Sequence, residues 1–203
     1  MGYLYVNGGT VAMDRITVGE LKSGNTVAGT GHILLQNNGV INLACQKTFT
    51  PAAYIGLKLN NGDFTWNDNG SSSLTTGALS VNTGTLIFQS TDNNFGTDGK
   101  GIVVNSGLPA GDGTALFSAD ALVDVTGLAD TSDWVTLITA AGGVTLSDMT
   151  LLTPASVAEG WGYRLFDLDG EAGNATALQV SIPEPATLSL LSIGALFLLR
   201  RKQ

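Results

Sequence analysis

The chain has 203 residues, among them one histidine and one cysteine, which limit the nucleophilic chemistry that it could perform. A Ser/His/Asp or Cys/His arrangement would have to use His32, and Cys45 is its candidate partner. A histidine at the start of a strand ordinarily lies on the sheet surface. A lone cysteine is ordinarily a small buried apolar residue. We therefore predict that neither residue is catalytic and that the chain is not an enzyme.

The densest acidic cluster is Asp167-Leu-Asp169-Gly-Glu171. If this segment is a strand, Asp167 and Asp169 lie on one face, about 7 Å apart. Carboxylate oxygens at that spacing suit Ca²⁺, although the residue order of an EF-hand loop is missing. A solvated turn is the commoner structure for such a run. We expect no cofactor, and Asp167, Asp169 and Glu171 are the candidate calcium ligands.

Two further functions would involve sugars. Aromatic residues gathered on one exposed face would stack on sugar rings, whereas dispersed burial would indicate a scaffold. The candidates are Trp66, Trp134, Trp161, Tyr54 and Tyr163. A polysaccharide lyase or hydrolase would need two facing carboxylates and, for a uronate substrate, a basic residue. The basic residues available for that role are Arg15, Lys22, Lys47, Lys58, Lys100 and Arg164.

The charge of the chain is acidic and unevenly distributed. Its formal net charge is −8, from 17 acidic and 9 basic side chains. An acidic balance argues against a nucleic-acid-binding protein, because phosphate contacts need clustered Lys and Arg. Three of the nine basic residues lie together at positions 200–202. The end of the chain therefore differs from the rest.

The last segment has three parts in a fixed order. Residues 183–185 read Pro-Glu-Pro, which cannot lie inside a helix. Residues 186–199 are uncharged and mostly apolar, and they predict a single hydrophobic helix. Its length of about 21 Å falls short of the roughly 30 Å hydrocarbon core of a bilayer. The basic cluster that follows is expected to stay cytoplasmic, with the preceding residues across the membrane.

These three parts resemble the PEP-CTERM protein-sorting signal of Gram-negative bacteria. The resemblance implies a transient stay in the inner membrane and an exosortase, a membrane-embedded cysteine transpeptidase-like enzyme, that removes the tail. It also implies that the body goes to the cell surface or an exopolysaccharide matrix. The residues it assigns are the recognition motif Pro183, Glu184 and Pro185 and the cytoplasmic basic stop Arg200, Arg201 and Lys202.

Proteins with this signal resemble one another in also carrying an N-terminal secretion signal. Residues 1–15 have neither a basic start nor an apolar stretch of seven or more residues. We therefore expect the sequence to be the C-terminal piece of a longer protein, or to begin at a wrongly chosen methionine.

Residues 1–182 predict an all-β body, because short β-branched and aliphatic runs alternate with Asn-Gly and Gly-Gly turns. Residues 1–95 repeat a loose Gly/Thr/Asn unit with uneven spacing, which suits stacked β-solenoid coils. Within it, residues 29–43 resemble autotransporter passenger repeats, which form parallel β-helices. Residues 96–182 carry evenly spaced candidate strands, which favour an antiparallel cap or a β-sandwich.

Three functions are therefore in competition. The first is a non-catalytic, exported component of the cell surface or exopolysaccharide matrix, delivered and processed through residues 183–203. The alternative is a carbohydrate-binding or adhesive module, with exopolysaccharide as its partner. A polysaccharide-degrading β-helix enzyme ranks last, because few basic residues are available in the body.

Overall fold

The described part of the chain folds into three β-sheets. The computed structural model describes residues 2–13, 15–19, 29–43, 56–67, 72–92, 101–105, 113–129, 131–148, 150–168 and 175–182. Within these ranges the chain forms seventeen strands and one short helix, which confirms the predicted all-β body. The predicted hydrophobic helix over 186–199 lies outside them. No helix in the described part of the chain is long and apolar enough to cross a membrane.

Each sheet takes every third strand from β1 to β15, and sheet B also contains β17 and β16. Sheet A contains, in spatial order, β1 (Gly2–Asn7), β4 (Gly31–Gln36), β7 (Gly62–Asn67), β10 (Gly84–Ser90) and β13 (Leu122–Leu128). Sheet B contains β2 (Thr10–Ala12), β5 (Val40–Leu43), β8 (Ser73–Thr76), β11 (Gly101–Val104), β14 (Val135–Ala140), β17 (Ala177–Ser181) and β16 (Gly162–Phe166). Sheet C contains β3 (Arg15–Val18), β6 (Gly56–Leu59), β9 (Leu79–Val81), β12 (Ala115–Phe117) and β15 (Val144–Leu146).

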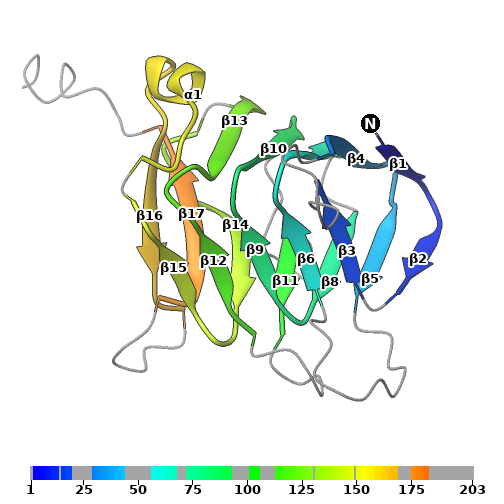
Figure 1. Ribbon diagram of the computed structural model, residues 1–203. Coiled ribbons are helices and arrows are strands. Elements are labelled where there is room, and N and C mark those ends of the chain that lie inside the picture. The colour runs from blue at the N-terminus through cyan, green and yellow to red at the C-terminus, as the bar shows by residue number, and fades with distance from the viewer. Residues whose placement is uncertain are drawn as a thin grey trace, which may run out of the picture.

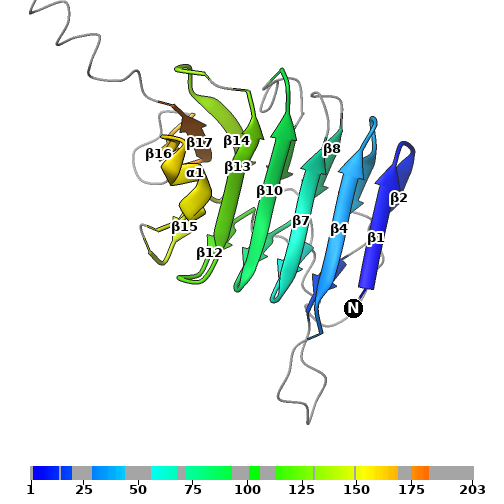
Figure 2. The ribbon, with the colours of Figure 1, turned by 90° about the horizontal axis from the view of Figure 1, so that it is seen from above.

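The chain visits sheets A, B and C in turn and then returns to sheet A. From β1 to β12, each strand pairs in parallel with the strand three places further on. Figure 2 shows the five strands of sheet A side by side, running from the N-terminal strand β1 to β13. The strands of sheet A begin at residues 2, 31, 62, 84 and 122. The repeat is therefore regular in space and uneven in sequence, because the connections differ in length.

Parallel pairing extends further along the chain than the sequence predicts. We expected solenoid-like repeats over 1–95 and antiparallel pairing over 96–182. Instead, β10 pairs in parallel with β13, β11 with β14, and β12 with β15. Antiparallel pairing is confined, in the described residues, to β14–β17 and β16–β17. The expected strand positions in this half are present, but the sheets run continuously across the predicted boundary.

The core lies between the three sheets. Because side chains alternate along a strand, residues with the same parity in register-paired strands stack on one another. Sheet A contributes the buried row Ile33, Phe64, Leu86 and Val123, sheet B contributes Ile41, Leu74, Ile102 and Ile138, and sheet C contributes Leu57, Leu79, Ala115 and Val144. Each row continues through several coils, so the core is long and narrow.

A short helix and two antiparallel strands close one end of this arrangement (Figure 1). Helix α1 (Pro154–Ala158) follows the N-cap Thr153, whose side chain accepts a hydrogen bond from the Ser156 amide. The buried Ser156 hydroxyl accepts a hydrogen bond from the Val125 amide of β13, 3.0 Å away. The backbone amide of Thr153 donates to the carbonyl of Val123. These bonds cover part of the outer edge of β13, the last strand of sheet A.

Glycines head four neighbouring strands of sheet A, and three of them lie at the corner where the chain arrives from sheet C. Gly2, Gly31, Gly62 and Gly84 are register partners in β1, β4, β7 and β10. A Cβ atom on Gly62 would lie 1.9 Å from the carbonyl oxygen of Gly31, and its φ of +135° favours glycine. A Cβ atom on Gly2, at the edge of the sheet, would meet nothing within 4 Å.

The four register-paired glycines at the start of the sheet A strands predict that the effect of a substitution on stability depends on its position. We expect Gly62→Ala to lower the free energy of unfolding by more than about 2 kcal/mol, because backbone atoms cannot move aside cheaply. The matched variant Gly2→Ala should change it by less than about 0.5 kcal/mol. Chemical denaturation of both variants measures the difference. Equal effects would contradict the close backbone contact at Gly62.

Tyr163 on β16 gives a second prediction. Burial, and to a smaller extent the negative charge of Asp148, raise the pKa of the Tyr163 phenol above its ordinary value of 10.0. The folded state therefore holds this proton more tightly than the unfolded state. The resulting stabilisation is complete below about pH 10 and is lost as the pH rises through the raised pKa of the folded state.

In the Tyr163→Phe variant, the free energy of unfolding should accordingly decrease less steeply with rising alkaline pH than in the parent. The measurement is urea denaturation of the parent and the variant from about pH 9 to about pH 11, with neutral pH as the reference. Parallel curves for the two proteins over this range would contradict the prediction.

Candidate functional site

The outer face of sheet A brings together three side chains that the sequence separates widely. Tyr3, His32 and Asp63 are register partners on the neighbouring strands β1, β4 and β7. The next residue in each of these strands points inward and joins the hydrophobic core: these residues are Leu4, Ile33 and Phe64. Leu4 is only partly buried there. Because successive side chains alternate between faces, burial of these three apolar residues places the polar row outside.

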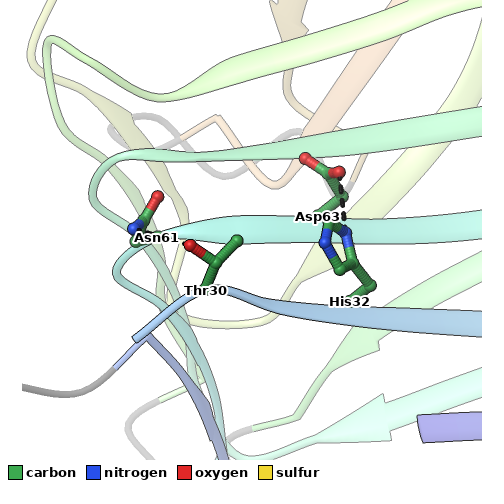
Figure 3. A network of polar contacts seen from close by, with 4 residues as sticks. All are labelled: Thr30, His32, Asn61 and Asp63. Atoms are coloured by element: carbon green, nitrogen blue, oxygen red, sulfur yellow. Dashed lines mark hydrogen bonds and ion pairs between the residues drawn. The ribbon is translucent and has the colours of Figure 1, made fainter. Parts of the chain in front are cut away.

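His32 forms the centre of this row, and Figure 3 shows it facing Asp63. Its Nδ1 atom lies 3.1 Å from Oδ2 of Asp63, and the two side chains are 29% and 37% exposed. The Tyr3 ring lies against the imidazole, with 5.1 Å between the centroids and 21° between the planes. A half-exposed pair of this kind contributes at most about 1 kcal/mol to stability. Its clearest effect is to fix the orientation of the imidazole.

Tyr5 extends the row along β1. Its ring is nearly parallel to that of Tyr3, with centroids 6.0 Å apart and planes 10° apart. The two residues are 57% and 64% exposed, which is high for large aromatic side chains. Aromatic faces of this kind pack against the apolar faces of sugar rings, and the Asp63 carboxylate can accept hydrogen bonds from hydroxyls, whereas Nε2 of His32 is buried. The arrangement is suited to binding a flat, hydroxyl-rich ligand.

Amide side chains lie at both ends of the sheet A strands. Figure 3 shows Asn61 at the strand start, where its Nδ2 donates to Oγ1 of Thr30 over 3.4 Å. At the opposite end, Nδ2 of Asn37 donates to Oδ1 of Asn7 over 2.6 Å. Asn37 and Asn38 have φ angles of 53° and 61°, which asparagine tolerates better than most residues. The exposed face of the early coils is therefore bordered by polar groups.

The aromatic residues that the sequence analysis selected do not form one surface. Trp66 and Trp161 are buried, at 0% and 4% exposure, and Trp134 is 40% exposed. Tyr163 is half-buried on β16, and Tyr54 lies outside the described residues. Trp66 has the inward parity of β7, which is why it joined the core. The alternating pair Tyr3-Leu-Tyr5 is the sequence signal for an exposed aromatic face, and our prediction did not include it.

The candidate calcium ligands are only partly described. Asp167 directly follows β16, whereas Asp169 and Glu171, like Cys45, lie outside the described residues. No group of three or more His, Cys, Asp or Glu side chains that could hold a metal occurs in the described ranges. The calcium site therefore stays a prediction.

Of the basic residues considered for a lyase, the three that the structure describes lie on three different strands. Arg15 lies on β3, Lys58 on β6 and Arg164 on β16. None of the three forms an ion pair with a carboxylate of the described residues. Lys22, Lys47 and Lys100 lie outside the described ranges.

The described body ends immediately before the Pro-Glu-Pro segment. Strand β17 ends at Ser181, and the amide of Ile182 donates to the carbonyl of Thr131 over 2.8 Å. Pro183, Glu184 and Pro185, as well as Arg200, Arg201 and Lys202, lie outside the described residues.

Residues 181–203 match the family model of the PEP-CTERM protein-sorting motif. The predicted resemblance of the tail is thereby confirmed, and the motif marks an exported protein that is sorted to the surface of Gram-negative bacteria by an exosortase. No curated protein and no solved structure matches the chain.

Proposed function

We propose that this exported protein, sorted through its C-terminal motif, is a non-catalytic structural component of the cell surface or the exopolysaccharide matrix. Its body would serve as a β-solenoid scaffold. The observation that carries the proposal is the coincidence of two boundaries: the matched motif covers 181–203, and the last described strand ends at Ser181.

Support for a scaffold comes from the pairing pattern. Fifteen successive strands occupy three parallel sheets in rotation, and each coil buries its apolar residues against the next. Such an arrangement gives a rigid body with varied outward-facing residues. An acidic, hydrated surface keeps such a body soluble among polysaccharides.

Support for a separable tail comes from the hydrogen bonds of the last strand. β17 pairs with both β14 and β16, and the backbone bond of Ile182 completes this edge. In our proposal, exosortase recognises Pro183, Glu184 and Pro185, while residues 186–199 lie in the inner membrane and Arg200, Arg201 and Lys202 stay cytoplasmic. Cleavage beyond Ile182 then leaves every described strand in place.

The test is processing in an exosortase-positive Gram-negative host, with the chain expressed behind a secretion signal. The parent should lose the mass of its C-terminal segment beyond the cleavage point. Replacing Pro183, Glu184 and Pro185 together by alanine should abolish this loss, because the recognition motif is gone. The matched control Glu159→Ala changes an exposed glutamate of the body and should be processed normally. Intact mass spectrometry gives the answer, and normal processing of the triple variant would refute the assignment.

A second candidate function is carbohydrate binding by the outer face of sheet A. The exposed, nearly parallel Tyr3 and Tyr5 rings favour it, together with the Asp63 carboxylate two strands away on the same face. The ligand suited to this surface is a neutral polysaccharide, since its only described charged pair is His32 with Asp63. This function is compatible with a scaffold at the cell surface.

Tyr5→Ala should weaken binding to an insoluble neutral glucan such as cellulose by about fivefold to tenfold, because one stacking ring is lost. Leu116→Ala is the matched control, since Leu116 is a 47% exposed apolar residue on a different sheet. A depletion assay with the purified full chain measures both. Equal affinities for the parent and Tyr5→Ala would remove this candidate.

A further inference from the structure

A second exposed aromatic cluster lies at the capped end of sheet B, on residues that the proposed function does not use. The guanidinium carbon of Arg164 on β16 lies 4.2 Å from the centroid of the Trp134 ring and 4.5 Å from that of Phe166. Trp134 and Phe166 are 40% and 38% exposed. The charged group is therefore held between two aromatic rings at the surface.

Hydrogen bonds fix the same guanidinium from the sheet. Arg164 pairs with Gln179 of β17, which pairs in turn with Thr136 of β14. Nε of Arg164 donates to Oε1 of Gln179 over 2.8 Å, and Nε2 of Gln179 donates to Oγ1 of Thr136 over 2.8 Å. Gln179 is only 6% exposed, so it is a fixed partner and not a surface side chain. We call these five residues the Arg164 cluster: Trp134, Thr136, Arg164, Phe166 and Gln179.

This geometry leaves part of the guanidinium available. Of its five N–H donors, the one on Nε is used by Gln179, and the four on the two Nη atoms form the fork that binds carboxylates in pairs. Arg164 makes no ion pair with any carboxylate that the structure describes. The rotamer entropy that an arginine normally loses on binding is already reduced here, because the group is stacked and hydrogen-bonded before a ligand arrives.

We propose that the Arg164 cluster binds the carboxylate of an acidic sugar, a uronate unit of a polysaccharide. The Nη fork would accept the carboxylate, and the exposed parts of the Trp134 and Phe166 rings would contact the sugar ring. The inference extends the proposed surface or matrix function by naming the class of ligand. It concerns a different face from the Tyr3–Tyr5 surface, which lies on sheet A at the other end of the coil (Figures 1 and 2).

The overall charge makes this site distinguishable from general electrostatic attraction. The chain has a formal net charge of −8, so a polyanion is repelled by the molecule as a whole. Binding of a polyuronate therefore needs a specific local site. An acidic peptide offers the same carboxylate group without the sugar ring, and the test therefore includes it as the alternative ligand.

The experiment titrates the purified full chain with polygalacturonate, with dextran as the neutral polymer and poly-glutamate as the acidic peptide. Tryptophan fluorescence reports on the site, because Trp134 is exposed whereas Trp66 and Trp161 are buried. We expect a spectral change with polygalacturonate, and none with dextran or poly-glutamate. Trp134→Phe should remove the signal, and the matched variant Trp161→Phe should keep it.

Arg164→Gln should weaken polygalacturonate binding at least about tenfold, because the charged fork is lost. Arg164→Lys keeps the charge but not the planar fork, and it should weaken binding by a smaller factor. The unfolding midpoint of each variant shows whether β16 is still folded. Unchanged affinity in a folded Arg164→Gln variant, equal binding of poly-glutamate, or no binding by the parent would each overturn the proposal. None of these results depends on processing of the tail, so the sorting assignment is tested separately.

Discussion

The close approach of successive backbones at the start of the sheet A strands is the contact on which the coil depends. At Gly62 no side-chain atom fits between the strand and the carbonyl of Gly31. At Gly62 and Gly84 this approach to the neighbouring carbonyl constrains where the chain turns from sheet C into sheet A, and therefore the register of β7 and β10. A shift of the strand register by one residue would turn the buried apolar side chains outward and the exposed side chains inward. The same contact therefore determines which side chains reach the surface.

Both candidate binding surfaces follow from that register. Tyr3, His32 and Asp63 meet because their strands pair in parallel and their inward neighbours are apolar. The Arg164 cluster forms where pairing becomes antiparallel: β17 runs back along β14, β16 runs back along β17, and the three strands set Arg164, Gln179 and Thr136 in one row. The cap thus does two things: it completes sheet B, and it carries a charged aromatic surface unlike the earlier coils.

Much of the fold, and little of the site, could be predicted from the sequence. Strand positions such as Leu122–Val125 could be predicted from β-branched runs between turn residues. The sorting tail could be predicted from the order of its three parts. Strand pairing could not be predicted, because β10 to β13 and β11 to β14 join residues far apart, and the variable connections hide the repeat. The five-residue helix was too short for a periodicity signal. The row from Tyr3 to Asp63 depends on this long-range register, and so does the contact of Trp134 with Arg164.

The central claim, that the chain coils through three parallel sheets, is tested most directly by disulfide trapping in a Cys45→Ser background. Thr65/Ile87, Asn42/Thr75 and Lys58/Ser80 are register pairs in sheets A, B and C. Replaced in turn by cysteine pairs, all three should form intramolecular disulfides under mild oxidation, because neighbouring strands lie within bridging distance. A β-hairpin from β6 to β7 would instead bring together Lys58 and Asp63, which the coil assigns to different sheets. Efficient trapping of Lys58/Asp63, with failure of the three register pairs, would contradict the account.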